Sequence, residues 1–142
     1  MICRLSEMKS QPTTKALVFR IALILYIVAV AYLCFANLNK VPDVPKHLFG
    51  LEMDKIVHFC MFFPFPVLGF LSYGHKSESV WQSIAVIVTI CALGAIFAGL
   101  TEIIQGMLPR RTEDIRDYKA DLLAIGISSF IMFLIDIRNV RK

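Results

Sequence analysis

Residues 79–105 of the chain read SVWQSIAVIVTICALGAIFAGLTEIIQ, and this stretch decides the fold. Between Glu78 and Glu102 it contains no charged side chain. A helix that crosses the hydrocarbon core of a bilayer needs roughly 20 mostly apolar residues, and this run supplies them. The stretch therefore predicts a membrane-spanning helix at residues 79–107, whose last turns carry the polar side chains of Glu102 and Gln105.

Two further uncharged runs and the composition of the whole chain indicate more spans of this kind. The runs predict helices at residues 16–38 and 56–74. Of the 142 residues, 57% are hydrophobic and 18% are charged, and the mean hydropathy is +0.67. Soluble domains average about 45–50% apolar and 25% charged residues, so this composition argues against a soluble enzyme, a disordered tail and a disulfide scaffold.

The fourth helix must begin in polar sequence. The last apolar run, residues 122–135, is too short to span a bilayer alone. Thr112 can serve as the N-cap, and Glu113 and Asp114 then occupy the first turn, where the helix dipole favours negative charge. We therefore expect a helix at residues 113–137.

These four helices predict the fold class: an all-α membrane protein, a bundle of four transmembrane helices with both termini on the same side. We expect one domain over residues 1–142. Pro64 and Pro66 should kink or unwind the second helix, at a point that faces the bundle. One alternative for the first helix is a signal peptide, because Ala29-Val30-Ala31 offers a small-x-small cleavage site.

Polar residues gather on one side of the predicted membrane. With four spans, the first and third loops lie on the same side whichever way the bundle is oriented. Ionisable side chains are costly within a membrane and by default serve a site. The residues that we expect to bind a ligand at this face are Asp54, His58, Glu102, Gln105, Arg110, Arg111, Asp114, Asp117 and Asp121.

Helical spacing suggests how some of these residues interact. Asp54 stands one turn before His58 and could orient its imidazole ring. Asp114, Asp117 and Asp121 share one face of the fourth helix. Asp121 lies deepest in the predicted membrane, and we expect it to pair with one of the two loop arginines, because an unpaired buried charge costs several kcal/mol.

The chemistry of the cluster leaves several interpretations open. Carboxylates with one histidine resemble a divalent-metal site, but the chain has no HExxH or ExxH motif, so we expect neither a metal nor another cofactor. A carboxylate–arginine network explains the same residues, and free arginine donors would then bind an anion such as a lipid phosphate. Lys55, Arg116 and Lys119 are expected to be solvated interfacial residues.

The order of these motifs resembles the VanZ-like family of small bacterial multi-pass membrane proteins. The segments Asp54-Lys55-Ile56-Val57-His58-Phe59 and Glu102-Ile103-Ile104-Gln105 match its first two motifs. Pro109 with Arg111, and then Asp117, follow in the family order, so that the resemblance covers residues 54–126. The family's polar positions fall on Asp54, Lys55, His58, Glu102, Gln105, Arg111 and Asp117.

Two positions depart from the family pattern. Asp121 stands where the family commonly has asparagine, and Ala124 stands where it commonly has glycine, although Gly126 follows two residues later. The first departure adds a negative charge to the site. The second affects how closely the fourth helix packs against its neighbours.

The resemblance implies a role in the bacterial cell envelope and a location in the cytoplasmic membrane. The family's namesake is linked to resistance to the glycopeptide antibiotic teicoplanin. The leading hypothesis is a non-enzymatic protein that binds or shields a surface component, such as an anionic or lipid-linked one, with membrane lipids as partners. The net charge of +4 comes from basic residues that flank the apolar runs, so we expect no nucleic-acid partner.

Two rival functions remain open from the sequence. One rival is an integral-membrane enzyme acting on a lipid phosphate or ester, with His58 or Glu102 as acid or base. The other is a proton or ion pathway through Glu102 and Asp121.

The orientation of the bundle is predicted from its basic residues. These are nearly balanced between the two sides of the membrane, with a slight excess beside the termini. Together with the resemblance, this excess predicts cytoplasmic termini and an outward-facing site.

Overall fold

In the computed structural model, residues 14–35, 47–48, 50–74, 77–108 and 114–140 are described. They form the helices α1 (Thr14–Phe35), α2 (Met53–Phe62), α3 (Pro64–Tyr73), α4 (Val80–Gly106) and α5 (Ile115–Val140), and the short strands β1 (His47–Leu48) and β2 (Leu51–Glu52). The segments long and apolar enough to cross a membrane are Thr14–Phe35, Met53–Tyr73, Val80–Gly106 and Ile115–Val140. The predicted all-α membrane protein with four spans is thus confirmed.

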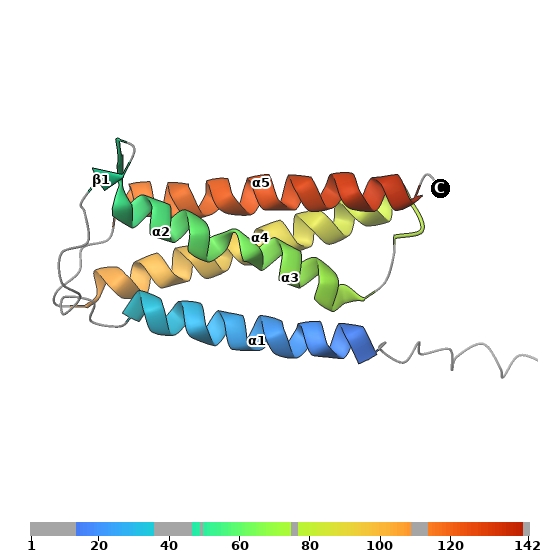
Figure 1. Cartoon of the computed structure of the whole chain (residues 1–142), viewed down its shortest axis with the longest axis horizontal. Helices are drawn as coiled ribbons and strands as arrows, with labels where there is room; N and C mark the ends of the chain where they lie inside the picture. The colour runs from blue at the N-terminus through green and yellow to red at the C-terminus, as the bar shows by residue number, and fades with distance from the viewer. Residues whose placement is uncertain (1–13, 36–46, 49, 75–76, 109–113, 141–142) are drawn as a thin grey trace, which may run out of the picture.

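The helices run along one another, and Figure 1 shows which of their ends meet. The end of α1, the start of α2, the end of α4 and the start of α5 lie at one end of the bundle, here called the site end. The start of α1 and the end of α5 lie at the other. Helix α4 packs along α5, helices α2 and α3 pack against α5, and α1 packs mainly against α3. This arrangement is the one that four consecutive spans require.

The second span is broken at the prolines, as the sequence predicts. Helix α2 ends at Phe62 and α3 begins at Pro64, because a proline has no N–H to continue the hydrogen-bond pattern. Tyr26 of α1 donates a hydrogen bond to the carbonyl of Met61 at the break. Phe62 and Pro66 are fully buried, so the break faces the bundle, where a neighbouring helix supplies a donor.

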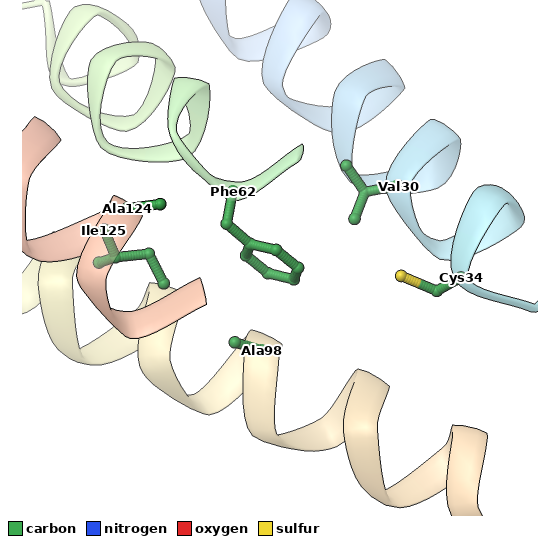
Figure 2. Packing of buried hydrophobic residues seen from close by; sticks show 6 residues of the cluster. All are labelled: Val30, Cys34, Phe62, Ala98, Ala124 and Ile125. Carbon is green, nitrogen blue, oxygen red and sulfur yellow. The ribbon is translucent and has the colours of Figure 1, made fainter. Parts of the chain in front are cut away.

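The apolar core lies beside this break. Figure 2 shows the ring of Phe62 pointing from the end of α2 toward Ala98 of α4, with α1 on its other side. Gly94 permits the close approach of helices, because a Cβ at this position would lie 3.0 Å from the ring of Phe65 and 3.3 Å from Ile125 of α5. Within lipid, helices associate through such close van der Waals packing, so these contacts hold α4 and α5 in register.

The helix boundaries differ from the predicted ones at the site end. Helix α5 begins at Ile115, and Asp114 precedes it as a cap whose Oδ1 accepts a hydrogen bond of 2.9 Å from the amide of Arg116. The prediction that Asp114 lies within the first turn was therefore wrong: its carboxylate satisfies a free amide, the usual role of an N-cap aspartate. The expected cap, Thr112, and its neighbour Glu113 lie outside the described residues.

Helix α2 begins at Met53, earlier than the expected residue 56. Asp54 then falls in its first turn, where the dipole favours a carboxylate. The two strands that precede it pair antiparallel, with His47 opposite Glu52. This hairpin was not predicted, and it leads the chain directly into the helix that carries His58.

Candidate functional site

Three helices bring most of the predicted polar residues together at the site end. Asp54 and His58 come from the start of α2, Glu102 and Gln105 from the end of α4, and the three aspartates from the start of α5 or the residue before it. The predicted arginines, Arg110 and Arg111, lie outside the described residues. The buried members of the group are His58, Glu102, Gln105, Asp117 and Asp121.

His58 and Asp121 form the centre of the cluster. The Nδ1 atom of His58 lies 3.1 Å from Oδ1 of Asp121, and both side chains are buried. Asp121 thus has a histidine of α2 as a partner, while the expected pairing with Arg110 or Arg111 lies outside the described residues. Asp121 also takes the orienting role that the sequence suggested for Asp54. With the Nδ1–H donated to this carboxylate, the Nε2 atom faces Asp117, whose Oδ2 lies 3.9 Å away.

Asp117 is a buried carboxylate with incomplete hydrogen bonding. Among the described residues its Oδ1 atom has no hydrogen-bond partner. The Nζ atom of Lys55 lies 3.8 Å from Oδ1, beyond hydrogen-bond distance, because Lys55 pairs more closely with Glu52. The Lys55 ammonium holds the pKa of the exposed Glu52 carboxyl below its usual range. Lys55 is therefore a half-buried member of the site, while Arg116 and Lys119 are exposed, as predicted.

Glu102 joins the end of α4 to the start of α5. Its Oε1 atom accepts a hydrogen bond of 2.5 Å from the amide of Asp114. Its Oε2 atom is buried and has no hydrogen-bond partner in the part of the chain that the structure describes. The Oε1 atom thus links α4 to the start of α5, and the Oε2 atom can accept a hydrogen bond from a ligand.

Gln105 has a structural contact. Its Nε2 atom donates a hydrogen bond of 3.0 Å to the carbonyl of Cys34, at the end of α1. The side chain is 3% exposed, so it bonds to a helix-end carbonyl instead of facing a groove. Gln105 therefore fixes α1 against α4 beside the site.

An open groove lies on the outer surface between α4 and α5, next to this cluster. It encloses about 590 Å³ and is lined by Gly99, Glu102, Ile103, Asp114, Ile115 and Tyr118. Its lining combines two carboxylates with apolar side chains. The described charged residues of the site end are acidic on balance, with Lys55, Arg116 and Lys119 as the cations and Glu52, Asp54, Glu102, Asp114, Asp117 and Asp121 as the acids.

A second buried acid lies at the opposite end of the bundle and was not predicted as a site residue. Asp136 is 1% exposed and accepts a hydrogen bond from the hydroxyl of Ser77. Its burial follows from the inward face of α5, which repeats through Asp121, Ile125, Ser128 and Met132. That spacing of three or four residues was visible in the sequence and could have placed Asp136 inside.

Comparisons with known proteins do not identify a family or a function for this chain. No family model, curated protein or solved structure matches the chain. The resemblance to the VanZ-like family therefore rests on the motifs of residues 54–126 alone. What the helices establish is a multi-pass membrane protein that contacts lipid, with a buried acid–histidine cluster at one end of its bundle.

Proposed function

We propose that this chain is a binding protein of the bacterial cytoplasmic membrane, which holds an amphiphilic envelope component by its polar head. The head sits in the groove between α4 and α5, and the apolar part lies along the outer surface of the helices. The site faces outward, and the component is a membrane lipid or a lipid-linked envelope precursor.

The observation that carries this proposal is the free oxygen of Glu102. This side chain is 8% exposed, and its Oε2 atom has no hydrogen-bond partner among the described residues. Leaving a buried acceptor unsatisfied costs about 1–3 kcal/mol, and more when it is charged. A ligand hydroxyl or ammonium group that donates to this oxygen would offset the cost, so the groove favours a head group rich in donors.

The groove also has the shape and polarity that an amphiphile needs. Ile103 and Ile115 on its walls are 57% and 63% exposed, so they face lipid when the bundle lies in a membrane. The carboxylates of Glu102 and Asp114 lie at the site end, where a head group would be. A ligand can thus enter sideways from the bilayer, with no need for a channel through the bundle.

The remaining support comes from the sequence. The resemblance to the VanZ-like family favours a role in the cell envelope. Arg110 and Arg111 follow the end of α4 along the chain, and we expect them to bind an anionic group, such as a phosphate, of the same ligand. A head group with both hydroxyls and a phosphate, as in a lipid-linked sugar, would use both kinds of residue.

Mass spectrometry of lipids that co-purify with the protein tests this proposal. Gly99→Leu should fill the groove, since a Cβ there already contacts the ring of Tyr118 at 3.7 Å, and Glu102→Gln should remove the charge. Ala85→Leu fills a different groove, near the start of α4, and is the matched control. We expect one lipid species to be lost from the first two variants and kept in the control.

Identical lipid profiles for the wild type, Gly99→Leu and Glu102→Gln would overturn the proposal. A lipid lost equally from all three variants would also overturn it, because the loss would not depend on the groove. Folding of each variant is checked by its melting temperature in the same detergent.

A second function has one observation in its favour. A histidine whose Nδ1 is held by a buried carboxylate, as His58 is by Asp121, is a common form of general base. His58 would then act on a lipid phosphate or ester. A modified lipid that accumulates in cells with the wild type but not with His58→Gln would favour this enzyme over the binding protein.

A further inference from the structure

We infer that Asp54, His58 and Asp117 form a binding site for a divalent transition-metal ion, with Zn²⁺ as the best fit. This site is distinct from the α4–α5 groove, and the inference does not depend on the proposed function. The site forms where α2 packs against α5, and the sequence has no metal-binding motif that would predict it.

The three side chains are close enough to share one ion. One ligand atom from each lies within 4.8 Å of the others. The Nε2 atom of His58 and Oδ2 of Asp117 are 3.9 Å apart. Zinc ligands at about 2.0–2.2 Å from the ion lie roughly 3.4 Å apart in a tetrahedron, so small side-chain movements close the site.

The orientation of His58 is that of a metal ligand. Metal-binding histidines almost always donate their other ring N–H to a carboxylate or carbonyl, which fixes the tautomer. Asp121 is fully buried and lies 3.1 Å from Nδ1 of His58. The Nε2 lone pair is then aimed toward Asp117. The carboxylate–histidine pair of a zinc site is thus present in the fold, on two helices that pack against each other.

The unsatisfied oxygen of Asp117 is an independent indication of a ligand. This side chain is more than nine-tenths buried, and its Oδ1 atom has no hydrogen-bond partner among the residues described. A buried carboxylate requires a cation or several donors to offset its desolvation. The Lys55 ammonium, 3.8 Å from Oδ1, supplies part of this charge without a hydrogen bond, and an ion bound between Asp117 and His58 would supply the rest.

The type of ion follows from the ligands. One imidazole nitrogen with two carboxylates suits Zn²⁺, whereas Mg²⁺ and Ca²⁺ prefer oxygen ligands alone. Asp54 is exposed, so the ion can enter from the membrane surface and keep an open coordination position there. Lys55 is the competing cation, since its Nζ atom lies 3.8 Å from Oδ1 of Asp117.

Isothermal titration of Zn²⁺ into the full-length protein in detergent, after treatment with a chelator, tests the inference. We expect one ion per chain, with at least tenfold weaker binding in Asp54→Asn and His58→Gln. Asp121→Asn should weaken binding by roughly 10–100-fold through the orientation of His58. Lys55→Met should strengthen it, because a competing positive charge is removed. Mg²⁺ should not compete.

Controls separate this site from other zinc-binding groups and from the groove. Asp136→Asn removes a buried acid at the opposite end of α5, and Gly99→Leu fills the groove; both should leave the affinity unchanged. Wild-type affinity in Asp54→Asn, with folding confirmed by its melting temperature, would overturn the inference. So would loss of binding in His75→Gln with binding retained in His58→Gln, or weaker binding in Lys55→Met.

Discussion

Replacing Asp121 by asparagine, alone and together with His58→Gln, measures how strongly the centre of the site holds α2 to α5. The Nδ1 atom of His58 lies 3.1 Å from a carboxylate that is fully buried. A hydrogen bond to a charged group contributes about 1.5–3 kcal/mol, against roughly 0.5–1.5 kcal/mol for a neutral one. The amide of asparagine still accepts from the ring, so Asp121→Asn should lower the free energy of unfolding by about 1–2 kcal/mol.

Reversible unfolding in mixed detergent micelles gives the free energies for a double-mutant cycle. If the two side chains bind each other, the losses of Asp121→Asn and His58→Gln are not additive, and we expect a coupling energy of about 1 kcal/mol or more. Asp136 provides the control pair with Asp121, since it lies roughly 22 Å further along α5 at about 1.5 Å per residue. That pair should be additive within about 0.5 kcal/mol.

Additive losses for Asp121→Asn and His58→Gln would refute the direct contact. A second cycle combines Asp121→Asn with Arg111→Ala and tests the partner that was expected from the sequence. A coupling energy with Arg111 larger than that with His58 would make the arginine the main partner of Asp121.

Two further predictions concern the packing that positions the site. Gly94→Ala should destabilise the protein by about 1–3 kcal/mol, because the new Cβ would lie 3.0 Å from the ring of Phe65. Gly126→Ala has open space around it and should be neutral or stabilising by up to about 1 kcal/mol. Equal effects of the two substitutions in unfolding measurements would contradict the close packing at Gly94. Tyr26→Phe should cost about 1 kcal/mol by removing the hydrogen bond at the proline break, whereas Tyr32→Phe, on an exposed side chain, should cost nothing measurable.

Much of the fold could be predicted because a membrane imposes simple requirements on sequence. A span needs a long run without charge, and the run from residue 79 to residue 101 meets that requirement with no knowledge of its neighbours. The prolines at 64 and 66 predict a break by their own chemistry. The number of spans then fixes which loops share a side, which placed the polar residues of α2, α4 and α5 at one end.

The pairing within the site could not be predicted, since it depends on how helices rotate against each other. Asp54 lies one turn from His58 along the chain, but the nearest carboxylate to Nδ1 is Asp121, which is 63 residues away. Helical spacing shows which residues share a face, and it does not show which face meets another helix. The sequence placed Asp54, His58 and Asp117 at the same face, but it could not show that these three side chains lie within 4.8 Å of one another, because they come from two helices.

The boundary of α5 shows a limit of another kind. The rules for helix caps favour Ser, Thr, Asp and Asn alike, and from the sequence we expected Thr112 as the cap, with Asp114 in the first turn. The structure uses the carboxylate of Asp114, whose amide is also bonded to Glu102. That second contact belongs to the packing of α4 against α5, which no local pattern reports.

The most direct test of the central claim, a polar site at the outer face of a four-span bundle, is cysteine labelling on intact spheroplasts. In a background without native cysteines, Glu52→Cys before α2 and Met107→Cys after α4 mark the site end, and Glu78→Cys marks the other end. We predict that an impermeant thiol reagent labels the first two from outside and labels Glu78→Cys only after permeabilisation. Labelling of Glu52→Cys and Met107→Cys from opposite sides would contradict the four-span bundle, and labelling of both only after permeabilisation would contradict the outward-facing site.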